Sequence, residues 1–171
     1  MNLGIDIGRV LIAPGGCGGN EDTSFIEGTL EEALQTPPMA GAFEAVTRLV
    51  EVFERRVWLI SKCFPRVQDR TRRWLDHHGF YDKTGLRRDR LIFCLERSQK
   101  AGHCERLGIE YFIDDRLDVL EAMRGRVPHL FLFGEQRRPV PELDWLVKVP
   151  NWEVALSAVL ERKEKGSAKR S

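Results

Sequence analysis

The sequence predicts a single α/β domain in which helices cover both faces of a doubly wound, mainly parallel sheet. Short aliphatic runs alternate with segments of helical periodicity along the whole chain. Turn residues bound most of these runs, which is the pattern of a parallel sheet buried on both faces. The length of 171 residues suits one hydrophobic core. We therefore expect one domain over residues 1–162 and no separate substrate domain.

The first half of the chain predicts two strands and two helices. In order, these are a strand at residues 3–7, a helix at 41–55, a strand at 57–60 and a helix from Pro65 to about Gly79. Proline is favoured in the first turn of a helix, and glycine is common just after the last turn. Residues 13–37 begin with a glycine-rich run that is too long for a plain connection, and taken alone this run indicates a flexible turn.

The second half continues the same alternation. The predicted elements are a strand at 91–94, a helix at 98–107 closed by Gly108, a strand at 109–113, a helix at 117–124, a strand at 129–133 and an edge strand at 146–149. Asn151 is placed to cap a last helix. Residues 163–171 are low in complexity, and we expect them to form a disordered tail.

Composition excludes several classes of protein. The 27 basic and 26 acidic residues give a net charge of +1, so no overall charge draws the chain toward nucleic acid or a membrane. No apolar run approaches the roughly 18 residues that span a bilayer. The first residues also lack the basic start of a secretion signal, so we expect a cytoplasmic protein. Neither a P-loop nor a G-x-G-x-x-G dinucleotide motif follows the first strand.

The cysteines do not form a recognisable framework. Their spacing is wide and irregular, without a C-x-x-C pair, so we interpret them as reduced or buried thiols rather than as disulfides or zinc ligands. The cysteines are Cys17, Cys63, Cys94 and Cys104.

Polar residues stand where the predicted strands end. Asp6 closes the first strand, Ser61 the second, and the pair Asp114 and Asp115 follows the strand at 109–113. Lys100 lies upstream of that pair, near the start of the intervening helix. In such sheets a ligand site forms beyond the carboxyl ends of the strands. Carboxylates can hold Mg²⁺ there while a hydroxyl and a lysine bind phosphate oxygens, so this set favours phosphoryl transfer.

The order and placement of these residues resemble the haloacid dehalogenase (HAD) superfamily of phosphatases and phosphotransferases. That family has an apolar strand ending in D-x-D, a strand ending in Ser or Thr, a helical Lys, and a strand ending in acidic residues. The resemblance covers about residues 3–133. It implies a Rossmann-like core and a nearly capless, phosphatase-type member, here with D-x-G in place of the first motif. It also implies that residues 13–37 form a flap or small insertion after the first strand.

The resemblance also implies roles for individual residues. Asp6 would be the nucleophile, forming an aspartyl-phosphate, and also a Mg²⁺ ligand. Ser61 would hydrogen-bond the phosphoryl group, and Lys100 would neutralise the intermediate. Asp114 would complete the metal site, with Asp115 as a further ligand. The remaining expected contacts are the backbone carbonyl of Gly8 with the metal, and Lys62 and Arg9 with the substrate.

Three of these positions have simpler interpretations that stay open at this point. Asp118, four residues after Asp114, is either another metal ligand or a favourable charge in the first turn of a helix. Ser61 could instead cap a helix, and Lys100 could be a solvated surface lysine.

Gly8 departs from the family pattern. The second aspartate of the motif acts as general acid and base, and its loss typically costs about 10²–10⁴ in rate. Three consequences remain open: substrates with good leaving groups, a proton supplied by another side chain, or binding with little catalysis. Glu21 and Asp22 are candidate substitutes by position alone.

We therefore expect a slow or specialised Mg²⁺-dependent phosphohydrolase acting on a phosphorylated small molecule or macromolecule. The alternative is a catalytically impaired module that binds a phosphorylated ligand or protein partner. A nearly capless site would be open, and basic residues of the stretch 62–90 either line its approach or are solvated helix faces. The arginines concerned are Arg66, Arg70, Arg72, Arg73, Arg87, Arg88 and Arg90.

Overall fold

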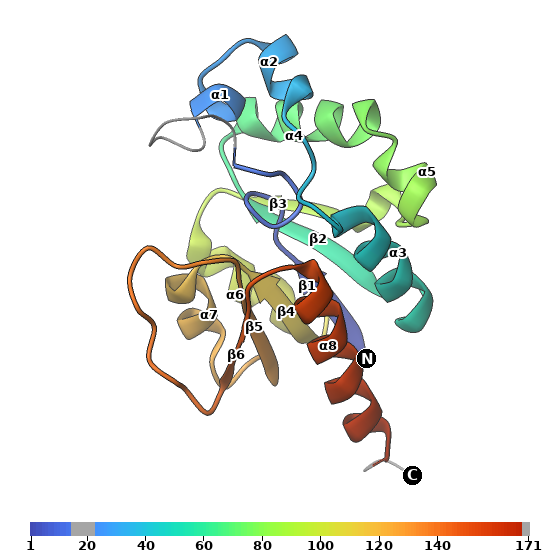
Figure 1. Ribbon diagram of the computed structural model, residues 1–171, viewed down its shortest axis with the longest axis vertical. Helices are drawn as coiled ribbons and strands as arrows, with labels where there is room; N and C mark the ends of the chain where they lie inside the picture. Colours follow the sequence, from blue (N-terminus) through green and yellow to red (C-terminus); the bar gives the residue numbers. More distant parts are fainter. Residues whose placement is uncertain (15–22, 169–171) are drawn as a thin grey trace.

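The computed structural model describes residues 1–14 and 23–168, which form one parallel six-stranded sheet in the order β3-β2-β1-β4-β5-β6 (Figure 1). The strands are β1 (Asn2–Ile5), β2 (Val57–Lys62), β3 (Leu91–Cys94), β4 (Ile109–Asp114), β5 (His129–Phe133) and β6 (Leu146–Val149). Every neighbouring pair is parallel. The predicted doubly wound α/β fold is confirmed, because the order reverses between β1 and β4.

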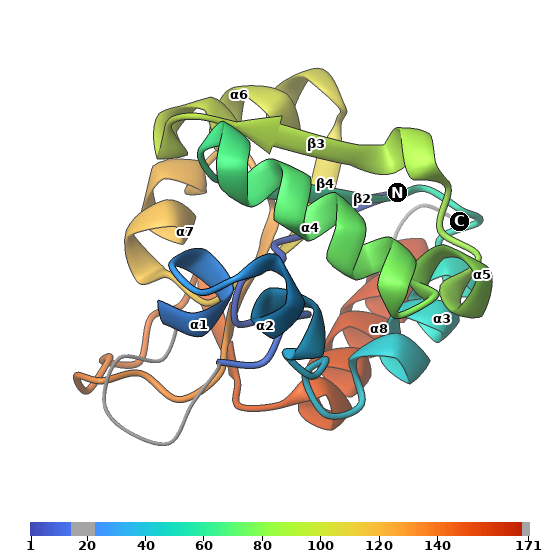
Figure 2. The same ribbon diagram turned by 90° about the horizontal axis from the view of Figure 1, so that it is seen from above.

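Helices cover both faces of the sheet, as predicted. They are α1 (Thr23–Ile26), α2 (Leu30–Gln35), α3 (Ala42–Val52), α4 (Pro65–His77), α5 (Phe80–Thr84), α6 (Arg97–Arg106), α7 (Leu117–Met123) and α8 (Trp152–Ala168), with a 3-10 turn η1 at Arg88–Arg90. Helices α3, α4, α5 and α8 contribute to the core on one face, and α6 and α7 to the core on the other (Figures 1 and 2). Helices α1 and α2 lie beside α4 (Figure 2).

Successive residues of β1 face opposite sides of the sheet, which explains why the strand is buried on both sides. Leu3 and Ile5 are fully buried in the core that contains α3 and α8. Gly4 lies between them in the strand, where an added Cβ would be only 2.4 Å from the ring of Phe112. Glycine is therefore required for the close approach of β1 to β4. Burying each large apolar side chain contributes about 1.5–3 kcal/mol.

Several local signals act as the sequence predicts. Pro65 occupies the first turn of α4, and the side-chain oxygen of Asn151 accepts a hydrogen bond from the backbone N–H of Val154 at 3.0 Å, at the start of α8. Helix α2, which was not predicted, has a capping box between Thr29 and Glu32. These contacts satisfy backbone groups that a helix end leaves without partners.

The structure differs from the predictions in three places. The segment 13–37, expected as a flap or small insertion, contains the two unpredicted helices α1 and α2, and the loop after Gly79 contains α5 and η1. The prediction of a tail from residue 163 was wrong for residues 163–168, which extend α8. In these last turns Gly166 lies close to Met1 and Tyr111, since an added Cβ would be 3.5 Å from a side-chain atom of each. Cys17 and residues 169–171 lie outside the described residues.

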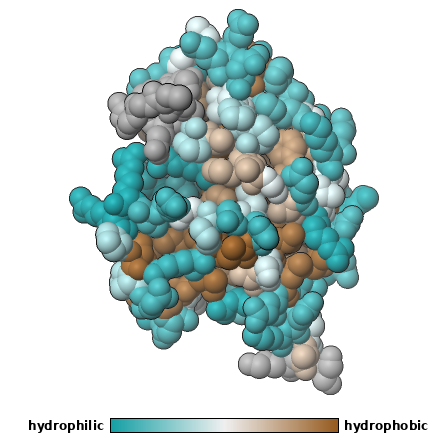
Figure 3. Space-filling view, in the orientation of Figure 1, coloured by the Kyte–Doolittle hydropathy of each residue, from teal (hydrophilic) through white to brown (hydrophobic). Residues whose placement is uncertain are grey.

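The face of the molecule that is turned to the viewer in Figure 1 carries both hydrophilic and hydrophobic residues on its surface. Figure 3 shows hydrophilic residues around most of its outline and hydrophobic residues gathered across its middle. Among the residues that the structure describes, no helix has the length and apolar character needed to cross a membrane.

Candidate active site

The candidate site lies at the carboxyl ends of β1, β2 and β4, beside the point where the strand order reverses. Ile5 is in register with Ile113, so the residues that follow them, Asp6 and Asp114, stand side by side. The backbone N–H of Asp6 donates to the carbonyl of Ile113 at 2.9 Å, which fixes this arrangement. This is the position at which parallel α/β sheets bind ligands.

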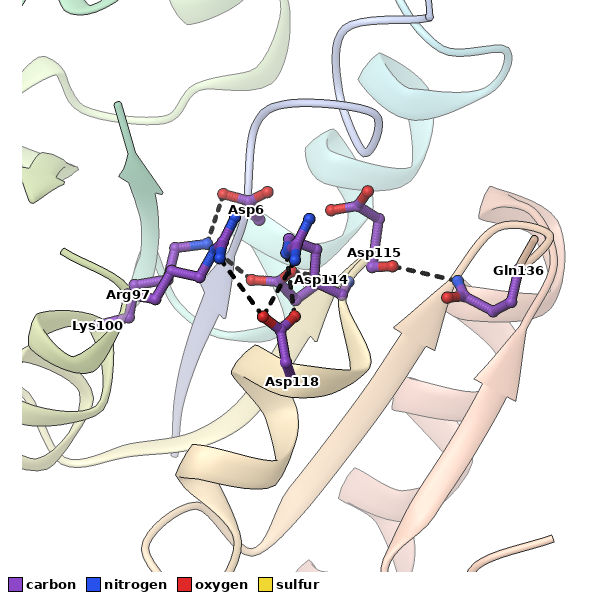
Figure 4. Close-up of polar contacts among 8 residues, drawn as sticks. Asp6, Arg97, Lys100, Asp114, Asp115, Asp118 and Gln136 are labelled. Atoms are coloured by element: carbon purple, nitrogen blue, oxygen red, sulfur yellow. Dashed lines mark hydrogen bonds and ion pairs between the residues drawn. The ribbon is translucent and has the colours of Figure 1, made fainter. Parts of the chain in front are cut away.

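A buried lysine joins the two carboxylates. Lys100, in the first turn of α6, places its Nζ atom 2.7 Å from Oδ1 of Asp6 and 2.7 Å from Oδ2 of Asp114 (Figure 4). Its side chain is only 3% exposed, so the interpretation as a solvated lysine is wrong. Burial opposes the charge on Lys100, but the two carboxylates outweigh it and raise the pKa of the ammonium group.

A third carboxylate completes an acidic cluster. Carboxylate oxygens of Asp6, Asp114 and Asp115 lie within 4.8 Å of one another. Burial and then the charge of Asp6 raise the pKa of Asp114, and the same two causes raise the pKa of Asp115 to about 6 against the opposing charge of Arg9. Oxygen donors at this spacing suit a hard divalent cation such as Mg²⁺.

Two contacts that the sequence did not predict position the acidic pair. The backbone N–H of Arg116 donates to Oδ1 of Asp114 at 3.0 Å. Gln136, in the loop after β5, donates from Nε2 to the carbonyl oxygen of Asp115 at 3.1 Å (Figure 4). No sequence pattern marks Gln136, because its role depends on the return of a distant loop to the end of β4.

Asp118 stands apart from this cluster. It lies in the first turn of α7, where both carboxylate oxygens accept hydrogen bonds from the Arg116 guanidinium at 3.0 Å. Arg97 is a further ion-pair partner at 3.6 Å (Figure 4). Of the two open interpretations, the structure supports the helix-terminal charge.

The remaining predicted site residues line one cavity of about 370 Å³ together with Asp6. Ser61 is buried in β2, and Phe64 rather than Ser61 occupies the N-cap position of α4. Arg9 reaches this cavity from a left-handed backbone conformation with φ of 58°. Gly8 also lines the cavity, and an added Cβ there would meet nothing within 4 Å.

One wall of the cavity is apolar. It includes Phe25 and Ile26 from α1 and Phe64 from the start of α4. Ile26 is 41% and Phe64 63% exposed, which is high for large apolar side chains. The Nζ atom of Lys62 lies 4.2 Å from the centre of the Phe64 ring. The cavity therefore has an acidic and basic floor beside an apolar mouth.

Helix α4 holds the segment that carries this apolar wall. Three residues spaced four apart, two in α4 and one directly after its end, contact backbone carbonyls of the segment 25–36. Buried Arg70 donates to the carbonyls of Phe25 and Gly28, Trp74 Nε1 donates to Thr36, and His78 Nε2 lies 3.0 Å from the carbonyl oxygen of Leu34. These bonds fix the position of α1 over the cavity.

Of the basic residues in the stretch 62–90, Lys62 lines the cavity and the seven arginines do not. Arg70 is buried under the segment 25–36, and three of the other arginines pair with nearby aspartates: Arg73 with Asp69, Arg87 with Asp89 and Arg88 with Asp76. The basic side chains that do line the cavity are Arg9, Lys62, Arg97, Lys100 and Arg116. Glu21 and Asp22, the candidate substitutes for the missing acid, lie outside the described residues.

The cysteines that the structure describes are buried free thiols, as predicted: Cys63, Cys94 and Cys104. Cys63 lines the cavity, but burial raises the pKa of its thiol to about 12. It therefore stays protonated near neutral pH and is a poor nucleophile.

Comparison with known proteins supports the fold. No family model matches the sequence, and no curated protein matches it. A haloacid dehalogenase-like family hydrolase from Xanthomonas campestris has a similar crystal structure, with a TM-score of 0.55 and 21% sequence identity over 82% of this chain. The match covers 61% of that chain, so this chain spans about three fifths of the neighbour's length. The fold is therefore haloacid dehalogenase-like. A de novo designed Rossmann 3x3 protein, solved by NMR, matches with a TM-score of 0.45 and 12% identity over 94% of this chain and 93% of its own.

Proposed function

We propose that this chain is a Mg²⁺-dependent phosphomonoester phosphatase in which Asp6 is the nucleophile. The observation that carries the proposal is the buried arrangement of Lys100 between Asp6 and Asp114, with Asp115 beside them. Buried charges are stable only when paired, so an acidic cluster on the floor of a cavity indicates a cationic ligand. The likeness to a HAD-like hydrolase supports the same chemistry.

The donors present fit a magnesium ion. Asp6, Asp114 and Asp115 supply carboxylate oxygens within 4.8 Å of one another, and the backbone carbonyl of Gly8 is the further predicted ligand. Bound Mg²⁺ would offset the negative charge of the phosphate and help to orient its oxygens.

The proposed reaction has two displacement steps at phosphorus. A carboxylate oxygen of Asp6 attacks phosphorus, and the ester P–O bond breaks with its electron pair leaving on the ester oxygen. Water then attacks the same phosphorus, the bond to Asp6 breaks, and the carboxylate is regenerated while the proton of the water passes to solvent. The hydroxyl of Ser61 and the ammonium of Lys100 bind phosphoryl oxygens through both steps.

Gly8 makes both steps slow. The position offers no group to protonate the ester oxygen or to activate the water, which corresponds to a loss of about 10²–10⁴ in rate. A carboxylate could be accommodated there, because an added Cβ has open space and the backbone is outside the left-handed region.

The test is phosphate release from an activated aryl phosphate and from a panel of phosphomonoesters, with and without Mg²⁺. Wild type, Asp6→Asn and Gly8→Asp are compared. We expect slow release that requires both the metal and Asp6, and faster release by Gly8→Asp. Phosphate release by Gly8→Asp alone would favour the alternative of a phospho-ligand binding module. No phosphate release by either wild type or Gly8→Asp would overturn the proposal.

A further inference from the structure

We infer that the site is selective for phosphate monoesters of aromatic alcohols, and this inference rests on the proposed function. Two independent features of the cavity lead to it: the apolar mouth around Phe64, and the absence of an acid at Gly8. The first favours binding of an aromatic group, and the second restricts which ester bonds can break.

The apolar mouth provides a surface for a flat ring next to the phosphate site. Ile26 and Phe64 line the same cavity as Asp6 and Ser61, yet both remain largely exposed. An aromatic group held between them would remove apolar surface from water. Lys62 lies beside the Phe64 ring and could contact a second ring through the same cation–π interaction.

The mouth is rigid enough to discriminate between ligands. Arg70, Trp74 and His78 bind the backbone of the segment that carries Phe25 and Ile26. Because α1 is held in place before a ligand arrives, little ordering is needed on binding.

Gly8 sets the chemical requirement. Glycine at residue 8 offers no proton to the ester oxygen, so in this inference the oxygen leaves as an anion when its bond to phosphorus breaks. A phenolate is a suitable leaving group because the pKa of a phenol such as tyrosine is about 10. An aliphatic alcohol, with a pKa near the value of about 15.7 for water, leaves far less readily. The departing phenolate then takes a proton from water.

Space for the leaving group is present at the same position. An added Cβ at Gly8 would meet no atom within 4 Å, and Gly8 lies on the cavity wall. The leaving oxygen and its ring can therefore pass over residue 8 toward the apolar mouth.

The experiment compares kcat/KM for phenyl phosphate, cyclohexyl phosphate and a series of substituted phenyl phosphates, in Mg²⁺. We expect phenyl phosphate to exceed cyclohexyl phosphate at least about 100-fold, within the contribution of a missing general acid. Reactivity should rise steeply as the phenol becomes more acidic, and this dependence should weaken in Gly8→Asp. Equal values for the phenyl and cyclohexyl esters would overturn the inference.

A pair of variants tests the apolar mouth separately. Phe64→Ala should raise KM for phenyl phosphate about tenfold, the effect of losing roughly 1.4 kcal/mol of contact. The same variant should raise KM for acetyl phosphate by a clearly smaller factor, because that small activated substrate has no ring. Leu95→Ala is the matched control, since Leu95 is 50% exposed but is not among the residues lining the cavity. An unchanged KM in Phe64→Ala would contradict the proposed contact.

Acetyl phosphate also separates the two proposals. Hydrolysis of acetyl phosphate without preference for aryl esters would overturn the selectivity and leave the phosphatase intact. No hydrolysis of any substrate would remove the proposed function itself. A phosphotyrosine peptide run beside phenyl phosphate identifies the source of the ring, because the better substrate shows whether a protein side chain or a small molecule supplies it.

Discussion

Lys100 and Asp6, 94 residues apart in the sequence, form a buried ion pair with Nζ and Oδ1 separated by 2.7 Å. The pair connects the start of α6 to the end of β1 and brings the lysine to the residue proposed as nucleophile. The same ammonium group also donates to Asp114. The site is thus assembled by charge pairing as well as by strand order, and its members depend on one another.

Replacement of Lys100 by methionine should destabilise the fold strongly. The change would leave Asp6 and Asp114 buried without their shared partner, and breaking a buried pair in this way costs about 3–5 kcal/mol. Urea unfolding in EDTA measures the loss. Lys62→Met is the control, because Lys62 is only partly buried and should cost far less. Equal stability of the two variants would contradict the pairing.

Replacement of Asp115 by asparagine should stabilise the metal-free protein at pH 7.5. The pKa of Asp115 is raised to about 6 by burial and the charge of Asp6, so its ionised form disfavours the fold. This penalty is absent below the unfolded pKa of about 3.9 and complete above about 6. Thermal unfolding in EDTA should therefore show a higher Tm for Asp115→Asn at pH 7.5 and no gain near pH 4.

Asp118→Asn is the control for that series. Although burial opposes it, hydrogen bonding from Arg116 holds the pKa of Asp118 below its usual value, so ionised Asp118 stabilises the fold. That contribution is present above the unfolded pKa and is lost as the pH falls through the lower folded pKa. Asp118→Asn should lower the free energy of unfolding at pH 7.5 by about 0–1 kcal/mol, the range typical of exposed pairs, and so lower Tm slightly. A lower Tm for Asp115→Asn as well would contradict the assignment.

Replacement of Arg70 by methionine should loosen the apolar wall. The carbonyls of Phe25 and Gly28 would lose a charged donor, which costs about 1–3 kcal/mol. Hydrogen exchange should become faster over residues 25–36, with KM for an aryl phosphate rising more than kcat falls. Arg66→Met is the control, because Arg66 is exposed on the same helix. Unchanged exchange in Arg70→Met would show that other contacts hold α1.

Replacement of Gly4 by alanine should destabilise the sheet. The new methyl group would lie 2.4 Å from the Phe112 ring, and overpacking of this kind costs about 1–3 kcal/mol. Gly8→Ala has open space and should change stability little. Urea unfolding measures the free energy of unfolding of both variants. The prediction is contradicted if Gly4→Ala is the more stable of the two.

The sequence predicted the sheet well because each strand is a short, mainly apolar run bounded by turn residues. The strands at 91–94, 129–133 and 146–149 have the predicted bounds, and the reversal between β1 and β4 follows from their order. The segment with the short helices α1 and α2 was missed because contacts with α4 hold α1, and because the capping box of Thr29 and Glu32, a local signal for α2, was overlooked. Arg70 and Trp74 bind that segment through backbone carbonyls, a contact that no local pattern reveals.

The sequence predicted which residues gather at the candidate site but not which contacts they make there. Strand ends placed Asp6, Ser61 and the acidic pair at one edge, which the structure brings together. Among the basic side chains, the predicted Arg9, Lys62 and Lys100 line the cavity. Arg97 also lines it and was not predicted, because it reaches the cavity through the docking of α6. In the stretch 62–90, the i, i+4 spacing of Asp69 and Arg73 is that of a local ion pair.

The most direct test of Asp6 as nucleophile is the mass of the protein quenched in acid during turnover of an aryl phosphate with Mg²⁺. Because Gly8 cannot activate water for the second step, the phosphorylated protein should accumulate. We predict an added mass of one phosphoryl group, mapped to Asp6, lost without metal and absent from Asp6→Asn. Continued phosphate release by Asp6→Asn, or turnover by wild type with the phosphoryl group on another residue, would contradict the account.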